Sequence, residues 1–127
     1  MSKNIFGDGF KLATKTVSFG GGSVVVSEFT DHDYHQYVSR YLVKQRKLDD
    51  EREDELTTEE ELDRNRDIGF RLLAVSLMAG TNRSFDDLYE ELTTPGKYSQ
   101  KAIEALKRAM DEVNQIEGNS TPTTTSE

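Results

Sequence analysis

The sequence predicts an α+β fold that is mostly α, with an N-terminal β-hairpin followed by about four helices and a disordered C-terminal tail. Alternating apolar residues flank a triple glycine within residues 10–29, which is typical of a hairpin. Later segments repeat apolar residues at helical spacing. Residues 118–127 are poor in apolar residues and predict a disordered tail, and residues 1–9 predict a flexible N-terminus. One domain is therefore expected over residues 10–117.

The glycines at 20–22 define the hairpin. A primed two-residue turn needs positive φ at both central residues, and Gly21-Gly22 is expected to supply it. In that register the apolar residues of both strands share one face, and a slip by one residue would scatter them. The predicted partners are Phe19 with Val24, Val17 with Val26, and Lys15 with Glu28. A lone hairpin is marginal in water, so it must pack on the helices or on another chain.

The first helix is predicted over residues 30–48. Thr30 is the expected N-cap, Asp33 occupies the third helical position, and Phe29 and Tyr34 occupy the hydrophobic-staple positions. The apolar stripe of this helix comprises Tyr34, Tyr37, Val38, Tyr41 and Leu42. The charged residues that follow, at about 49–57, predict a frayed or flexible connector.

Three further helices are predicted at 58–79, 84–92 and 99–117. Thr58 and Glu61 form the expected capping box of the first, and Gly80 is expected to end it. Ser84 and Ser99 are the expected N-caps of the other two. Residues 68–79 are apolar on almost every side, so this helix should be the buried centre of the fold.

Composition restricts the class of protein. The 127 residues include no cysteine, which excludes disulfides and thiolate metal sites. The longest apolar segment, 68–79, is much shorter than the roughly 20 residues of a membrane span. No apolar run near residue 1 is long enough for a signal peptide. We therefore expect a soluble, cytoplasmic protein.

The net charge of −8 comes from one segment. Residues 49–61 hold nine acidic residues and one Arg, and the rest of the chain has equal numbers of acidic and basic residues. A neutral body lacks the broad basic surface that nucleic acid requires. The acidic segment also lacks calcium-loop spacing, so it is interpreted as a solvated connector or as a face for a basic partner.

The histidines offer the candidate for metal chemistry. His32 and His35 stand one helical turn apart beside Asp31 and Asp33, a spacing that allows shared coordination. A polar first turn is the simpler interpretation, because Asp is favoured there electrostatically and further ligands would have to come from elsewhere. The triple glycine lacks the ending of a phosphate loop, and no nucleophile motif is present. We expect no metal, no cofactor and no enzymatic activity.

Arg71 is the charged residue inside the apolar segment 68–79. Its guanidinium could reach a partner or an interior carboxylate. Alternatively its stem lies along the core while its charged end stays in water, which is the favoured interpretation. Similarly, the tyrosines of the first helix fit core packing, although tyrosines on one helix face are also common in interfaces.

The order of segments resembles the tail assembly chaperones of long-tailed, lambda-like bacteriophages, the family of the minor tail protein G. KTVSFGGGSVVVSEFT at 15–30 resembles the opening hairpin of that family. RDIGFRLLAVSLMAG at 66–80 resembles its apolar central helix, and ELTTPGKYSQKAIEAL at 91–106 resembles its turn into the last helix. Together these segments cover most of residues 10–117.

The resemblance implies a bacteriophage tail assembly chaperone of the host bacterial cytoplasm that is absent from the mature virion. Such a protein binds the tape measure protein, keeps it soluble and recruits tail tube protein, mainly through a longer form made by ribosomal frameshifting. It also implies a homo-oligomer. This chain would be the short form.

Contact residues are inferred from the apolar pattern alone. We expect Ile5, Phe6, Phe10 and Leu12, which lie outside the regular core pattern, to contact a partner or a second copy. Val25 points to the hairpin face opposite Val24 and Val26, where a second chain is expected to cover it. The alternative function is an unrelated helical adaptor that binds a partner through its hairpin edge. A small metal-dependent hydrolase using His32 and His35 is a distant third.

Overall fold

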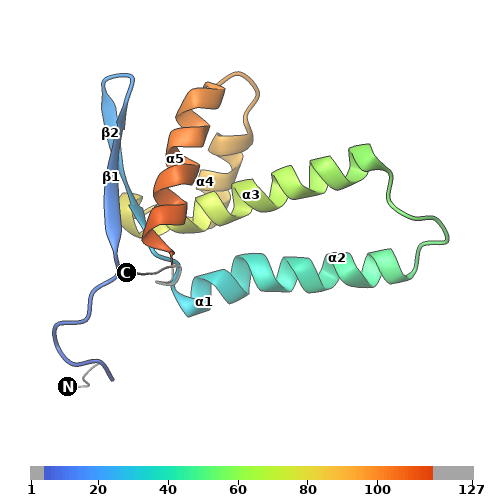
Figure 1. Ribbon diagram of the computed structural model, residues 1–127, viewed down its shortest axis with the longest axis horizontal. Helices are drawn as coiled ribbons and strands as arrows, with labels where there is room; N and C mark the ends of the chain where they lie inside the picture. Colours follow the sequence, from blue (N-terminus) through green and yellow to red (C-terminus); the bar gives the residue numbers. More distant parts are fainter. Residues whose placement is uncertain (1–4, 116–127) are drawn as a thin grey trace, which may run out of the picture.

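The computed structural model describes residues 5–115 and confirms the predicted fold class (Figure 1). The antiparallel strands are β1 (Thr14–Phe19) and β2 (Gly22–Ser27). The first helical stretch comprises α1 (Asp31–Tyr34), the π-helical segment η1 (His35–Ser39) and α2 (Arg40–Asp50). It is followed by α3 (Thr58–Thr81), α4 (Phe85–Thr93) and α5 (Gln100–Val113). The tail predicted at 118–127 and the first four residues of the predicted flexible N-terminus lie outside the described residues.

The hairpin has a different register from the predicted one. Its turn is Gly20-Gly21, with φ angles of 60° and 87°, and Gly22 already belongs to β2. Strand partners are therefore displaced by two residues from the prediction: Val17 pairs with Val24, Phe19 with Gly22, and Lys15 with Val26. A shift of two leaves every side chain on its expected face, so the hydrophobic pattern cannot distinguish the two registers.

A side-chain contact supports the observed register at the open end of the hairpin. The backbone N–H of Ala13 donates to the carboxylate of Glu28 at 2.7 Å, and the N–H of Glu28 donates to the carbonyl of Ala13 at 2.9 Å. The predicted register would have placed Glu28 opposite Lys15. Lys15 instead forms an ion pair with Glu112 of α5.

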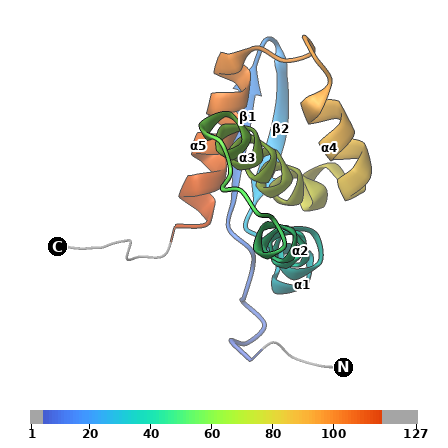
Figure 2. The same ribbon diagram turned by 90° about the vertical axis from the view of Figure 1, so that its right-hand side faces the viewer.

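The central element of the fold is α3, with the hairpin, the first helical stretch and α4 arranged around it (Figures 1 and 2). In Figure 1, α2 and the first half of α3 form an arm that leads away from the hairpin. The second half of α3 is buried, as predicted, with Leu73 and Ala74 each 0% exposed. Val26 of β2 and Val38 of η1 are almost fully buried in the same core.

The ends of α3 differ slightly from the prediction. Its capping box is formed by Thr57 and Glu60, because the N–H of Glu60 donates to Thr57 Oγ1 at 3.1 Å and the N–H of Thr57 donates to Glu60 Oε1 at 2.9 Å. The sequence TTEEE at 57–61 fits this pair as well as the predicted one. The helix continues through Gly80 to Thr81, and Asn82 ends it in the left-handed conformation at φ 55°.

Gly80 lies within α3, at a position where the hairpin leaves no room for a side chain. A Cβ at this position would lie 2.4 Å from the carbonyl oxygen of Val25 and 2.8 Å from its Cβ. The glycine predicted to stop α3 therefore permits the close approach of α3 to β2. This approach places the C-terminal end of α3 against the strand.

The start of the first helical stretch is as predicted. The N–H of Asp33 donates to Thr30 Oγ1 at 3.2 Å, and the rings of Phe29 and Tyr34 lie 5.6 Å apart. The N-cap and the hydrophobic staple are thus both confirmed. The stretch ends at Asp50, two residues beyond the predicted end. The buried or half-buried members of its predicted stripe are Tyr37, Val38 and Tyr41.

Two ion pairs join the end of α2 and the connector that follows it to the first turns of α3. Arg64 Nη1 lies 2.5 Å from Asp49 Oδ2, and Arg52 Nη2 lies 3.3 Å from Glu60 Oε1. The connector 51–57 is exposed apart from the half-buried Leu56. The acidic segment 49–61 consequently lies at the end of the arm that is farthest from the hairpin (Figure 1).

The last two helices begin at their predicted caps. The hydroxyls of Ser84 and Ser99 accept from the backbone N–H of Asp87 and Ala102, each at 3.1 Å. Helix α5 ends at Val113, before the predicted end at 117. The buried residues of these helices are Phe85, Leu88, Leu92, Ala109, Met110 and Val113.

Candidate functional site

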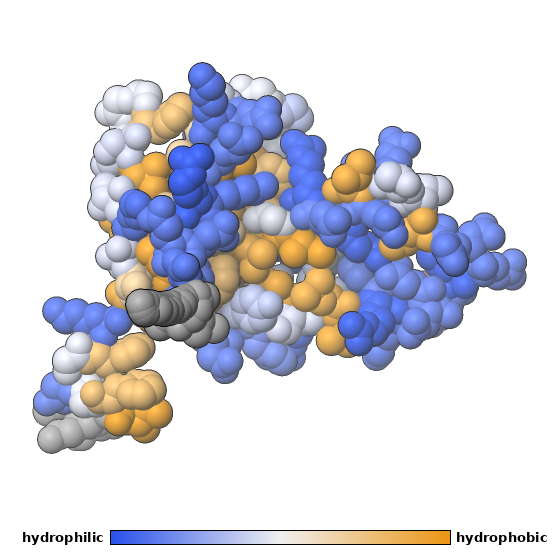
Figure 3. Space-filling model, in the orientation of Figure 1, coloured by the Kyte–Doolittle hydropathy of each residue, from blue (hydrophilic) through white to orange (hydrophobic). Residues whose placement is uncertain are grey.

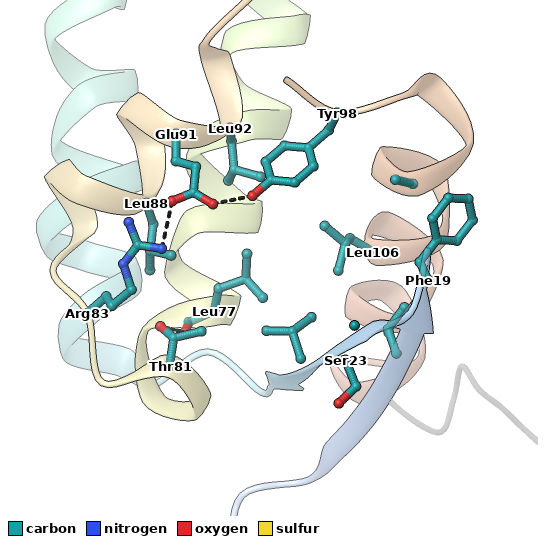
Figure 4. Close-up of a pocket in the computed structure, with 14 residues that line it drawn as sticks. Phe19, Ser23, Leu77, Thr81, Arg83, Leu88, Glu91, Leu92, Tyr98 and Leu106 are labelled. Atoms are coloured by element: carbon teal, nitrogen blue, oxygen red, sulfur yellow. Dashed lines mark hydrogen bonds and ion pairs between the residues drawn. The ribbon is translucent and has the colours of Figure 1, made fainter. Parts of the chain in front are cut away.

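An apolar groove, which we call the hairpin groove, lies between the hairpin, α4 and α5 with α3 at its base (Figure 4). Its volume is about 300 Å³. The apolar residues that line it are Val17, Phe19 and Val24 of the hairpin, Leu77 of α3, Leu88 and Leu92 of α4, and Ala102 and Leu106 of α5.

The hairpin groove combines a buried base with an exposed aromatic edge. Leu77 and Leu88 are only 4% and 3% exposed, whereas Phe19 is 48% exposed. A cavity of about 150 Å³ holds a benzene-sized group, so this groove has room for about two apolar side chains. Its largely apolar lining suits the burial of apolar groups.

A polar cluster formed by Arg83, Glu91 and Tyr98 stands on one side of the groove (Figure 4). Arg83 Nη1 lies 2.7 Å from Glu91 Oε1, and the hydroxyl of Tyr98 donates to the other carboxylate oxygen. The hydrogen bond from Tyr98, followed by that from Arg83, holds the pKa of Glu91 below its usual range. The carboxylate is therefore charged at neutral pH and fixes the position of Tyr98 beside the groove.

A second cluster surrounds Arg71 where η1, α2 and α4 meet α3. The guanidinium carbon of Arg71 lies 3.9 Å from the ring centre of Tyr41 and 5.2 Å from that of Tyr89. Its Nε donates to Asp67 Oδ2 and its Nη1 to the carbonyl of Tyr37, both at 3.3 Å. The side chain is 23% exposed. Arg71 thus reaches a partly buried carboxylate, against the favoured interpretation of a charged end in water.

Asp67 accepts hydrogen bonds at the centre of this cluster. Burial would raise the pKa of its carboxyl, but hydrogen bonds from Tyr41, Tyr89 and Arg71 outweigh burial and lower it. Burial, with the hydrogen bond to Asp67 second, raises the pKa of Tyr41 to about 12. The carboxylate is therefore ionised and the phenol neutral at physiological pH, so the cluster keeps one charge state there.

Aromatic stacking extends the Arg71 cluster to α4. The rings of Tyr37 and Phe85 lie 4.4 Å apart and are nearly parallel, at 5°, and Phe85 stacks on Tyr89 at 5.7 Å. These contacts fix the start of α4 against η1 and α3. Because α4 forms one wall of the hairpin groove, the cluster helps to set the width of the groove.

The predicted N-terminal contact residues lie away from this groove. Ile5 is 94% exposed and Phe6 75% exposed, and the rings of Phe6 and Phe10 stack at 5.6 Å. Leu12 is half-buried. Figure 1 shows this segment leading away from the open end of the hairpin. The structure therefore separates these four residues from the groove.

Val25, the fifth predicted contact, is half-buried. Its carbonyl oxygen and Cβ face Gly80 of α3 at distances that exclude any larger residue there. Part of the cover that was expected from a second chain therefore comes from α3 of the same chain.

His32 and His35 are both exposed, and neighbouring Asp33 donates its backbone N–H to the cap of α1. Within residues 5–115, no three His, Cys, Asp or Glu side chains lie close enough together to hold a metal ion. No helix of that range is both long and apolar enough to cross a membrane.

Comparisons with protein-family models, with curated proteins and with solved structures find no match to this chain. The site is therefore interpreted from its own geometry.

Sequence reasoning missed the hairpin groove. Most of the apolar residues that line the groove belong to the core faces of separate predicted elements. A gap between these faces depends on the angles between the elements, which local sequence patterns do not determine. One signal was present, because Phe19 lies beside the glycine turn, in the last strand pair of the hairpin. An aromatic residue at the tip of a hairpin is harder to bury than one near its middle.

Proposed function

We propose that this protein is a bacteriophage tail assembly chaperone that binds apolar helical segments of the tape measure protein and helps to recruit tail tube protein in the host bacterial cytoplasm. The observation that carries the proposal is the hairpin groove, which offers a preformed apolar surface with Phe19 exposed at its edge. The resemblance of three segments to that family supports the choice of partner.

A helix is the form of partner that fits the groove. Helix-in-groove recognition inserts apolar side chains spaced three or four residues apart. Room for about two side chains corresponds to one helical turn of such a stripe. The polar cluster of Arg83, Glu91 and Tyr98 lies where the polar flank of the same helix would pass.

The size of the groove implies weak binding by each copy. Two buried apolar side chains contribute about 3–6 kcal/mol before the costs of association are subtracted. One groove alone therefore binds weakly and reversibly, whereas several copies on one long partner gain affinity through multivalency. Reversibility is the property that a chaperone absent from the finished particle requires.

Co-expression with the long helical product of the neighbouring gene tests the proposal. We expect that product to be soluble and to co-purify with the unchanged chain. The Phe19→Asp variant should lose this effect, because it places a charge at the edge of the apolar groove. Leu62→Asp is the matched control, since Leu62 is 63% exposed on α3 and does not line the groove.

Two results would oppose the proposal. Failure of the unchanged chain to solubilise or to bind the neighbouring product would remove the chaperone function. Equal activity of Phe19→Asp and Leu62→Asp would move the binding surface away from the groove. Specific binding of the unchanged chain to a different cellular protein would favour the adaptor instead.

A further inference from the structure

We propose that the free edge of β1 is a pairing surface for a second copy of this chain, which adds its own β1 in antiparallel orientation to form a four-stranded sheet. This inference uses a surface other than the hairpin groove and does not depend on the proposed function.

The backbone pairing shows which residues form the free edge. Hydrogen-bonded and non-hydrogen-bonded pairs alternate along an antiparallel ladder. The N–H of Glu28 donates to the carbonyl of Ala13, so Ala13 and every second residue after it direct their backbone groups toward β2. Thr14, Thr16 and Ser18 therefore direct theirs outward. All three are exposed, and no other backbone group of residues 5–115 bonds to them.

The two edges of the hairpin differ in whether the rest of the fold covers them. The outer edge of β2 is closed by α3, whose Gly80 lies against the Val25 carbonyl. Among the described residues, no other strand or helix forms backbone hydrogen bonds with the outer edge of β1, and the hairpin lies at one margin of the molecule with the helices on its other side (Figure 1). Helix α5 packs against the apolar face of the hairpin, where Lys15 pairs with Glu112.

The edge of β1 also lacks the usual protection against pairing. Monomeric proteins blunt edge strands with proline, bulges, short length or charge. β1 has six residues in regular register, contains no proline, and directs its one lysine to Glu112 on the inner face. In Figure 3 the left margin of the molecule, where Figure 1 shows the hairpin, is pale with orange patches, and the blue surface lies to its right. An unprotected edge of this kind indicates a strand that is paired in the working protein.

A second copy fits this edge electrostatically. The net charge of −8 arises from residues 49–61, at the far end of α3 from the hairpin (Figure 1). The 22 helical rises between Thr58 and Gly80 span about 33 Å, several Debye lengths at physiological salt. Two hairpin edges can therefore approach while the acidic ends remain far apart.

Two-fold pairing also gives the exposed N-terminal segment a partner. In a register centred on Thr14, Phe10 of one copy lies opposite Ser18 of the other, and Leu12 lies opposite Thr16. Side chains alternate along a strand, so Phe10 and Leu12 share a face with Thr14. One self-complementary interface then covers two free edges and two apolar segments.

The mass of the full chain in solution and the hydrogen exchange of its backbone amides test this inference. We expect a concentration-dependent dimer in which the amides of Thr14, Thr16 and Ser18 are protected and lose protection on dilution. The Thr16→Pro variant should weaken dimerisation by roughly tenfold or more, because it removes an outward N–H. Proline is tolerated at such an edge position, so the hairpin itself should persist.

Ser23→Pro is the matched control. Its N–H points to the opposite edge of the hairpin, because Ser23 pairs with Ser18. This variant should dimerise like the unchanged chain. The inference is overturned if the unchanged chain stays monomeric with rapidly exchanging Thr14, Thr16 and Ser18 amides, or if Thr16→Pro and Ser23→Pro dimerise equally well. Neither result would bear on binding in the hairpin groove, so the two proposals can fail separately.

Discussion

The guanidinium of Arg71 stands among two tyrosine rings, an aspartate and a backbone carbonyl, and so joins α3 to its neighbours by charge as well as by packing. Sequence alone identified it as the charged residue of an apolar segment. The sequence could not show that Asp67 is the partner of Arg71. Asp67 lies four residues earlier on α3, but it is only one of several carboxylates that Arg71 could reach.

Replacing Arg71 by Ala should lower the free energy of unfolding by about 1–3 kcal/mol, because hydrogen bonds to a partly buried carboxylate are lost together with the stack on Tyr41. Urea denaturation measures this change. Arg66→Ala is the control, since Arg66 lies over the Phe70 ring at 5.2 Å on the same helix and should cost less than about 1 kcal/mol. Equal losses in the two variants would show that the Arg71 cluster adds no stability of its own.

Tyr41 should make the stability of the Arg71 cluster depend on pH in the alkaline range. Its pKa is raised from 10.0 to about 12 in the folded protein, so its contribution to stability is present below pH 10 and is lost as pH rises through about 12. In a spectroscopic titration, part of the tyrosine absorbance change should appear only near pH 12. This late step should be absent from Tyr41→Phe. A wild-type titration that is complete near pH 10 would contradict the described environment of Tyr41.

At the scale of the elements, replacing the two glycines of α3 by alanine should change the stability in opposite directions. A Cβ at Gly80 would lie 2.4 Å from the Val25 carbonyl, whereas a Cβ at Gly69 would meet only the flexible end of Lys107, at 3.4 Å. Gly80→Ala should therefore destabilise the fold by about 1–3 kcal/mol through overpacking. Gly69→Ala should stabilise it by about 0.5–1 kcal/mol through helix propensity.

Thermal unfolding of both variants separates these effects within one helix. A stabilising Gly80→Ala would mean that α3 does not approach β2 as closely as described. It would also reopen the outer edge of β2 as a surface for another chain.

The helices and the hairpin could be predicted from the sequence, but the strand register and the exact capping residues of α3 could not. The hairpin, the caps at Thr30, Ser84 and Ser99, and the buried half of α3 follow from local patterns. Three consecutive glycines permit two turns that place the same side chains on the same face. Two threonines before three glutamates likewise permit two capping boxes, and only packing between elements selects one.

At the scale of the whole molecule, the hairpin has one apolar face and two unlike edges. The face lines the groove and packs on the helices, α3 closes the edge of β2, and within residues 5–115 no backbone group bonds to the outer edge of β1. The groove could not be predicted because it exists only once α4, α5 and the hairpin have taken their positions around α3. Of the expected N-terminal contact residues, Ile5, Phe6 and Phe10 are exposed and Leu12 is half-buried, and their contact with another chain stays a prediction.

The most direct test of binding in the hairpin groove is photo-crosslinking from its edge. Phe19 is replaced by the photoreactive benzoylphenylalanine, and the chain is co-expressed with the long helical product of the neighbouring gene. Leu62, exposed on α3 outside the groove, receives the same replacement in the control. We predict a crosslink to that product from position 19 and none from position 62. A crosslink from both positions, or from position 62 alone, would contradict binding in the groove.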